Sequence, residues 1–400
     1  MALRYFLSCF VLVLIFIQAG SLPNMAYAQA PSKTMSDKEK EVRAVWISTV
    51  YNIDWPSRSG LTAAAQKKEF TDMLDKLHAM GINTVFVQVR GASDAIYPSK
   101  LVTWSRSLTG KEGKSPGYDP LSFMIEETHR RGMEFHAWFN PFRASTGGSI
   151  KELPQNHPAK QHPEWVVPHD KKLIFNPGIP EARQHIIDAI MEVVENYDID
   201  GVHLDDYFYP YGEDTFQDDR TFAIYKGSMS NKAEWRRNNI NAFVQDLHQE
   251  ITAEKNEIDF GISPFGIWRN SRDDSTGSDT TGNSAYDSQY ADARSWIRNE
   301  WIDYIAPQLY WSIGFKPAAY EKLVDWWAKE TRGTSVKLYI GHGAYKLGSN
   351  TTDWKSSDAI IRQLQLNRKY PEVRGSIFFS AKTLLNNTAG IGNRLTQFYN

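Results

Sequence analysis

The sequence has almost no cysteine: Cys9 is the only one in 400 residues. One thiol excludes an intramolecular disulfide and a multi-cysteine zinc site. Cys9 itself lies in the apolar run 6–17, which follows Arg4 and precedes the small-x-small sequences Ala26-Tyr27-Ala28 and Ala28-Gln29-Ala30. This pattern predicts that residues 1–30 are a secretory signal peptide, cleaved after Ala28 or Ala30. An uncleaved anchor and a lipid-modified Cys9 are less consistent with the short run and the early cysteine.

The sequence also lacks an excess of charge of either sign. Lys and Arg number 45 against 47 Asp and Glu, a formal net charge of −2. A nucleic-acid-binding chain is typically basic, so nucleic acid is not an expected partner. The only long apolar run is in the predicted signal peptide, so we expect no stable membrane insertion after cleavage. The predicted location is the periplasm, the cell envelope or the medium, and the oligomeric state does not follow from the sequence.

What the sequence does contain is a regular alternation of strand-like and helix-like segments. Residues 31–40 are polar and predict a flexible lead-in, and residues 41–400 predict one domain. Eight apolar runs predict strands, at Val42–Thr49, Asn83–Val89, Glu134–Asn140, Gly201–Tyr207, Asp259–Phe265, Tyr304–Trp311, Val336–His342 and Gly375–Ser380. Helical periods lie after them, at Ala63–Met80, Pro120–Arg131, Glu181–Asn196, Lys232–Lys255, Gln289–Glu300, Ala318–Glu330, Ser357–Lys369 and Gly392–Phe398. Eight such units predict an α/β fold, a closed TIM barrel.

The connections between these segments differ in length according to their direction. Helix-to-strand links are short, whereas strand-to-helix links are long at 90–119, 141–180, 208–231 and 266–288. Long loops in compact domains are usually functional or disordered. In a TIM barrel these four would lie on the C-terminal face, where active sites are built.

One predicted strand ends in two adjacent acids. Asp205 and Asp206 follow Gly201-Val202-His203-Leu204 and precede Tyr207-Phe208-Tyr209-Pro210. The period of a strand places His203 with Asp205 on one face and Leu204 with Asp206 on the other. Neighbouring carboxylates repel, so their pKa values split, and one can stay protonated while the other is ionised. That division suits acid-catalysed glycoside cleavage.

Other reaction classes lack their motifs. There is no Gly-x-Ser-x-Gly sequence for a serine hydrolase and no His-x-x-x-His sequence for zinc, and Gly341-His342-Gly343 lacks the third glycine of a dinucleotide loop. His203, the two acids, His136 and His342 could in principle meet around one ion. We nevertheless expect neither a metal nor a cofactor.

Five segments in order along the chain resemble glycosyl-hydrolase-like family 10. They are Val42–Thr49, Gln88-Val89-Arg90 with Asp94 and Tyr97-Pro98, Trp138-Phe139-Asn140-Pro141, Gly201–Pro210 and Ile302–Trp311. The resemblance covers nearly the whole chain after residue 40. It implies a TIM barrel, an exported or envelope location and action on a glycan. A similar member of the family acts at the division site on peptidoglycan strands stripped of their stem peptides.

The resemblance also suggests roles for the acids. The strand resembles a chitinase signature, but His203 and Tyr207 stand where that signature has acids, which argues against a chitinase mechanism. The pair is more similar to N-acetylglucosaminidases with adjacent aspartates, in which Asp205 would orient the substrate acetamide and Asp206 would donate the proton. An amylase-like alternative makes Asp205 a covalent nucleophile in a retaining glucan hydrolase. That alternative needs a separate acid, and the fifth strand ends Ser263-Pro264-Phe265-Gly266 without one.

The expected glycan-binding residues lie at the tips of several strands and in the long loops. A histidine among them could equally be a buried barrel residue, and Arg90 could simply pair with Asp94. A glycan-binding barrel without catalysis is the alternative from another class. The residues expected to contact substrate are Trp46, Arg90, Asp94, His136, Asn140, His203, Tyr207, Trp268, Gln308, Tyr310, Trp311 and His342.

Overall fold

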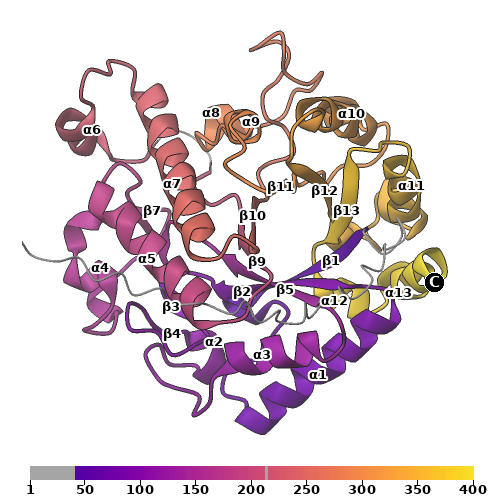
Figure 1. Ribbon diagram of the computed structural model, residues 1–400, viewed down its shortest axis with the longest axis horizontal. Coiled ribbons are helices and arrows are strands. Elements are labelled where there is room, and N and C mark those ends of the chain that lie inside the picture. The colour runs from indigo at the N-terminus through magenta and orange to yellow at the C-terminus, as the bar shows by residue number, and fades with distance from the viewer. Residues whose placement is uncertain (1–40, 212–214) are drawn as a thin grey trace, which may run out of the picture. The chain divides into compact units, whose positions relative to one another are not determined.

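The computed structural model describes residues 41–211 and 215–400. Eight parallel strands close into a barrel in the order β1-β13-β12-β11-β10-β9-β5-β2 (Figure 1). The first strand pairs with the last, since Val42 lies opposite Gly375 and Val45 opposite Phe378. The predicted TIM barrel is therefore confirmed. Its strands are β1 Val42–Ile47, β2 Thr84–Arg90, β5 Glu134–Phe139, β9 Gly201–Leu204, β10 Asp259–Ile262, β11 Tyr304–Ile305, β12 Lys337–His342 and β13 Val373–Phe378.

Helices cover the barrel on its outside, near the predicted positions. Those that correspond to the predicted helices are α1 Ala63–Ala79, α3 Pro120–His129, α5 Pro180–Asn196, α7 Lys232–Glu254, α9 Ala293–Arg298, α10 Tyr320–Thr331, α11 Asp358–Asn367 and α13 Ile391–Tyr399. The helix predicted from Gln289 begins later, because Tyr290 has a left-handed φ of 56° and the side chain of Asp292 caps Ser295. Between residues 41 and 211 and beyond 214, no helix is long and apolar enough to cross a bilayer.

The long loops contain short elements that the sequence did not predict. A parallel pair, β3 Asp94–Ala95 and β4 Thr103–Trp104, follows β2, and an antiparallel sheet of β6 Arg143–Ser145, β7 Val166–His169 and β8 Lys172–Phe175 follows β5. Short α-helices are α2 Arg106–Thr109, α4 Pro158–Gln161, α6 Asp219–Tyr225, α8 Ala285–Ser288 and α12 Ala381–Leu385. Turns of 3₁₀ helix are η1 Val50–Asn52, η2 Ile150–Glu152, η3 Pro163–Trp165, η4 Lys316–Ala318, η5 Ala344–Lys346, η6 Thr352–Trp354 and η7 Thr388–Gly390.

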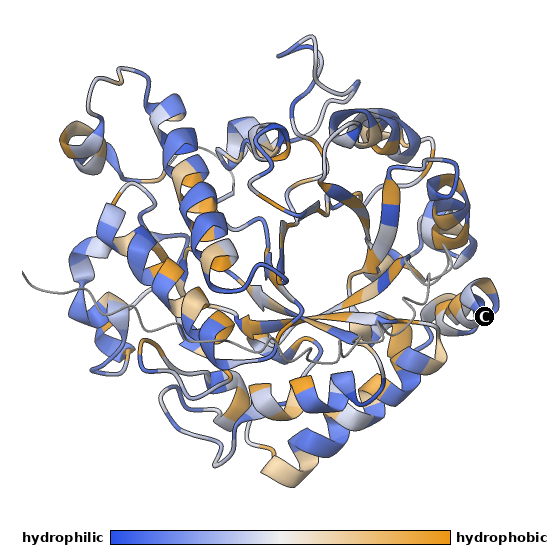
Figure 2. Cartoon of the chain, viewed as in Figure 1, coloured by the Kyte–Doolittle hydropathy of each residue, from blue (hydrophilic) through white to orange (hydrophobic). Residues whose placement is uncertain are grey.

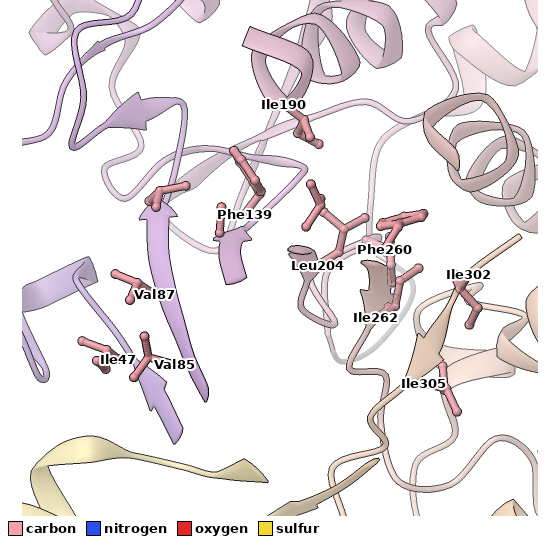
Figure 3. Packing of buried hydrophobic residues seen from close by; sticks show 14 of the residues in the cluster. Ile47, Val85, Val87, Phe139, Ile190, Leu204, Phe260, Ile262, Ile302 and Ile305 are labelled. Atoms are coloured by element: carbon pink, nitrogen blue, oxygen red, sulfur yellow. The ribbon is translucent and has the colours of Figure 1, made fainter. Parts of the chain in front are cut away.

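Apolar residues form two separate clusters, one on each side of the strands. The outer cluster joins strands to helices, and Figure 3 shows Phe139 and Leu204 of the strands together with Ile190 of α5. Each helix contributes one apolar face. Ile240, Val244 and Leu247 are buried on α7, where orange bands interrupt the blue in Figure 2. Burial of such faces is the dominant favourable contribution to folding.

The inner cluster fills the barrel with large rings, including Trp46, Phe86, Trp138 and Tyr304. Two glycines on neighbouring strands make room for them. A Cβ on Gly201 would lie 2.2 Å from the His136 ring, and one on Gly261 would lie 2.2 Å from the Tyr304 ring. The barrel is therefore a packed core rather than a pore.

Several predicted strands end earlier than expected, as β11 and β9 show. β11 ends at Ile305, and Pro307 beyond it has no backbone N–H for the ladder. β9 ends at Leu204 instead of Tyr207. The predicted signal peptide and lead-in lie outside the described residues.

Candidate functional site

A cavity of about 400 Å³ opens at the carboxyl ends of the barrel strands. Every barrel strand, or the segment that follows it, contributes to its wall. We refer to it as the cleft. Its lining residues are Trp46, Ser48, Val50, Tyr51, Ile53, Gln88, Trp138, Arg143, Asp205, Asp206, Tyr207, Tyr211, Ser263, Phe265, Gln308, Tyr310, Tyr345 and Phe379.

Both adjacent acids line the cleft. Asp205 is 5% exposed and Asp206 is 7% exposed. The predicted alternation of faces is wrong at this point: His203 faces the barrel interior and Leu204 the outer cluster, but the strand ends at Leu204 and the chain then turns. Because the alternation stops there, Asp205 and Asp206 reach the same cavity.

Asp205 is held at both of its carboxylate oxygens. The side-chain amide of Asn140 donates to Oδ2 at 3.1 Å, and the backbone N–H of Tyr207 donates to Oδ1 at 3.3 Å. Burial and the neighbouring charge of Asp206 nevertheless raise the pKa of Asp205. Burial also raises the pKa of Asp206, against the lowering effect of hydrogen bonds with Tyr211 and Gln308. The pair therefore retains a proton well above the usual range of an aspartate.

Arg143 is a cleft residue that the sequence did not indicate. It lies on β6, is 4% exposed, and its guanidinium lies 4.0 Å from the centre of the Tyr207 ring. Its Nη1 donates to the carbonyl of Gly91 at 3.1 Å, and its buried Nε has no hydrogen-bond partner among the described residues. The positive charge of Arg143 lowers the pKa of both Asp205 and Asp206. In the sequence, Arg143 is an unremarkable basic residue three positions after Asn140.

A chain of buried polar rings lies beneath the cleft. The indole N–H of Trp46 donates to Nε2 of His203 at 3.1 Å, so Nδ1 of a neutral His203 carries the proton toward the Tyr304 hydroxyl at 3.0 Å. Tyr304 in turn lies 3.2 Å from Nδ1 of His136. Burial, with His136 nearby, holds the pKa of His203 well below its usual value.

The placement of these histidines requires a correction. His136 and His203 do not line the cleft: they lie inside the barrel below it, because they occupy inward-facing positions within the strands. His342 points outward, with Nδ1 2.8 Å from the Gln363 side chain and Nε2 3.1 Å from that of Ser376. It therefore packs against α11 instead of facing substrate.

Two tryptophans expected in the cleft are also elsewhere. Trp268 stacks on Trp326 with ring centres 5.6 Å apart, and its indole N–H donates to Asp292. Trp311 packs against the loop after β10, where a Cβ on Gly266 would lie 2.7 Å from its ring. Trp268 thereby packs against α10, and neither ring is among the residues that line the cleft.

Arg90 and Asp94 likewise lie outside the cleft. Arg90 is fully buried and donates from Nη1 to the carbonyls of Asn140 and Pro141, at 2.8 and 3.0 Å. It thereby fixes the backbone at the residue that holds Asp205. Asp94 accepts the backbone N–H of Ala92 and lines a second cavity. Trp46, Tyr207, Gln308 and Tyr310 line the cleft, and Asn140 lies behind Asp205.

Three exposed tyrosines border the cleft. Tyr51 is 61% exposed, Tyr345 51% and Tyr211 37%, and all three line the cavity. Large aromatic rings are usually buried, so their exposure around one opening indicates a surface for a ligand with apolar faces. Within residues 41–211 and 215–400, no three His, Cys, Asp or Glu side chains are grouped so that they could hold a metal ion.

Comparison of the chain with known proteins identifies its family. Residues 41–377 match the family described as glycosyl hydrolase-like 10. The chain is 50% identical over 383 residues to glycosyl hydrolase YngK of Bacillus subtilis (strain 168), covering 94% of this chain and 73% of that protein. It is 40% identical over 372 residues to glycosyl hydrolase DigH of Escherichia coli (strain K12), covering 87% of this chain and 85% of that protein.

Solved structures agree with the fold. The glycoside hydrolase domain of PgaB from Bordetella bronchiseptica superposes with a TM-score of 0.56 at 12% identity, covering 89% of this chain and 98% of that domain. An endo-1,4-β-mannanase from Rhizomucor miehei superposes with a TM-score of 0.55 at 10% identity, covering 92% and 96%. At these identities the likeness establishes the TIM-barrel fold alone.

Proposed function

The chain belongs to the glycosyl hydrolase-like 10 family, and from that premise we propose that it is an exported glycoside hydrolase that cleaves a glycan containing N-acetylhexosamine. Peptidoglycan strands are the proposed substrate. The observation that carries the proposal is the pair of adjacent buried acids, Asp205 and Asp206, in a cleft at the C-terminal face of the barrel. Active sites of TIM-barrel enzymes lie on that face.

The surroundings of the two acids favour different roles. Both oxygens of Asp205 accept hydrogen bonds from fixed donors, which suits a carboxylate that orients the acetamide N–H of the substrate. Asp206 forms hydrogen bonds with Gln308 and Tyr211. In this proposal it carries the proton that goes to the leaving oxygen. A carboxyl with a raised pKa is suited to general-acid catalysis near neutral pH.

The proposed reaction has two steps. As Asp206 protonates the glycosidic oxygen, the bond from C1 to that oxygen breaks and the carbonyl oxygen of the acetamide bonds to C1. Water then attacks C1 and gives a proton back to Asp206. The bond between C1 and the acetamide oxygen breaks, and the acetamide remains on the sugar. The substrate thus supplies the nucleophile, as in known exceptions to the two-carboxylate scheme.

The composition of the cleft supports this route over the retaining alternative. Asp205 and Asp206 are the only acids among its described lining residues. The end of β10 contributes Ser263 and Phe265, neither of which can donate a proton to a leaving sugar. A mechanism with Asp205 as a covalent nucleophile would leave only the adjacent Asp206 as the acid.

The test is release of new reducing ends from denuded peptidoglycan, chitin oligomers and a glucan, with products identified by mass. We expect Asp206→Asn to lower turnover about a hundredfold, the usual contribution of a general acid, with an unchanged melting temperature or a higher one. Asp198→Asn is a matched control, because the Asp198 side chain is 98% exposed and precedes β9, at the opposite end of the strand from the cleft. Near-normal activity of Asp206→Asn would refute the assignment.

Other outcomes would select the alternatives. Binding of glycan without release of products would favour a non-catalytic glycan-binding barrel. Cleavage of a glucan that has no acetamido group, with a sugar ester trapped on Asp205, would favour a retaining glucan hydrolase. Export is tested separately, by N-terminal sequencing of the protein recovered outside the cytoplasm, with cleavage expected after Ala28 or Ala30.

A further inference from the structure

A second cavity of about 370 Å³ adjoins the cleft and has no role in the chemistry above. Val50 and Tyr51, both in η1, line the cleft and this cavity alike. The remaining wall comes from Asn52 and Ser59, from the loop after β2, which contains β3, β4 and α2, from the segment Ala144–Thr146 after Arg143, and from His157. The two cavities are therefore neighbours on the same face of the barrel, on either side of one short helical turn.

The charged groups that line the second cavity are mainly acidic, and most of its other polar side chains are hydroxyls. Two carboxylates, Asp94 and Glu112, line it, and burial together with the charge of Asp94 raises the pKa of Glu112. Arg106, the one cation among the described residues that line it, lies 4.0 Å from Glu112 and is 61% exposed, so solvent screens much of its charge. His157 is neutral, because burial and the charge of Arg90 lower its pKa to about 4. The cavity is thus suited to donors such as sugar hydroxyls and unsuited to an anion.

The turn between the cavities holds an aromatic ring at their shared rim. Tyr51 and Asn52 have left-handed φ values of 56° and 53°, which are uncommon for residues other than glycine. The side-chain amide of Asn52 donates to the carbonyls of Pro56 at 3.0 Å and Ser107 at 2.9 Å, which ties the turn to α2. Strained backbone that is fixed in this way often occurs at ligand sites. The Tyr51 ring is consequently presented to both cavities.

We propose that the second cavity is a further sugar subsite of the cleft, which binds an uncharged unit of the same glycan chain and excludes a unit that carries a carboxylate. This inference rests on the proposed function, because it takes the ligand of the cleft to be a glycan. Sugar hydroxyls would donate to Asp94 and Glu112, and Tyr51 would contact the chain where it passes between cavities. In a glycan whose sugars alternate between neutral and acidic, this selection sets the register in which the chain lies across Asp205 and Asp206.

The experiment compares chain lengths. Chitin oligomers of two to six units and denuded peptidoglycan strands are cleaved by the full protein and by Thr146→Trp, which fills the second cavity from its half-buried wall. Thr71→Trp, on the outer helix α1, is the matched control. We expect kcat/KM of the unaltered protein to rise about tenfold once the oligomer is long enough to reach the second cavity. Thr146→Trp should abolish that rise and leave cleavage of the shortest productive oligomer unchanged.

A second variant tests the charge selection without adding bulk. Glu112→Gln keeps the shape of the side chain and reduces the negative charge, so products of denuded strands should include a new register in which an acidic sugar occupies the second cavity. An unaltered product pattern would overturn the exclusion of acidic sugars. Equal loss at all chain lengths in Thr146→Trp, or no dependence on chain length in the unaltered protein, would overturn the subsite while leaving the proposed function intact. Failure of the unaltered protein to bind or cleave any of these glycans would refute the proposed function, and the subsite with it.

Discussion

Arg143 lowers the pKa of both acids in the cleft, and replacing it tests the electrostatics of the cleft directly. Burial and Asp206 raise the pKa of Asp205, and Arg143 is the largest of the influences that lower it. The same guanidinium lowers the pKa of Asp206. Arg143→Gln removes this positive charge, so the pKa values of both carboxyls should rise.

The size of the shift follows from the general effect of a nearby charge. An opposite charge in close proximity lowers the pKa of a carboxyl by about one to three units, and each unit corresponds to about 1.4 kcal/mol. The proposed mechanism requires one proton shared between the two acids, so both limbs of a bell-shaped profile of kcat/KM should move to higher pH in Arg143→Gln by about one unit or more.

The assay is the pH dependence of kcat/KM for the released reducing ends, measured beside a thermal melt at each pH. Arg143→Lys is the control, since it keeps the charge while losing the planar contact with Tyr207. It should keep the profile near that of the unaltered protein even if its activity falls. An Arg143→Gln protein that is folded and active, with its profile unmoved or moved to lower pH, would refute the reasoning.

Three further predictions concern stability. Burial and the charge of Asp206 raise the pKa of Asp205 above its ordinary value of 3.8, so loss of the proton that the pair retains costs stability as the pH rises, and Asp205→Asn should melt higher than the unaltered protein at high pH and equally below 3.8. Gly201→Ala should destabilise by about 1–3 kcal/mol, because its Cβ would lie 2.2 Å from the His136 ring, whereas Gly147→Ala, whose Cβ would lie 4.0 Å from the Ser145 hydroxyl, should be far milder in the same melts. His342→Ala should lose about 1–3 kcal/mol of stability through the buried partners it abandons, with kcat/KM of the folded protein unchanged, and a large change in KM would place His342 back at the substrate.

The barrel could be predicted from the sequence because its signals are local and repeated. Each strand is a short apolar run, each helix has one apolar face, and the eight alternations leave few other ways to bury both. The same logic located Asp205 and Asp206, since residues directly after a barrel strand must lie on its C-terminal face. Even there, the prediction was wrong in detail: β9 ends at Leu204 and not at Tyr207, so the two acids do not lie on opposite faces of the strand.

The loops were not predictable in the same way. Arg143 reaches the cleft because the segment after β5 folds back as the β6, β7 and β8 sheet, whose pairing joins residues far apart in the chain. The exposed ring of Tyr51 depends on a left-handed turn that its sequence does not signal. Long-range pairing and unusual backbone angles leave no periodic pattern.

The sequence by itself therefore determined the architecture, the end of the barrel that carries the site, and the presence of paired acids there. Only the tertiary structure decided which side chains share the cleft. Trp46, Tyr207, Gln308 and Tyr310 line the cleft as predicted. His136 and His203 lie in the barrel core instead, and other residues that were expected to contact substrate lie outside the cleft. The physical reason is that a strand position fixes only whether a side chain points inward or outward. How close that side chain lies to the carboxyl end of the barrel, and which loop covers it, depend on contacts with the rest of the chain.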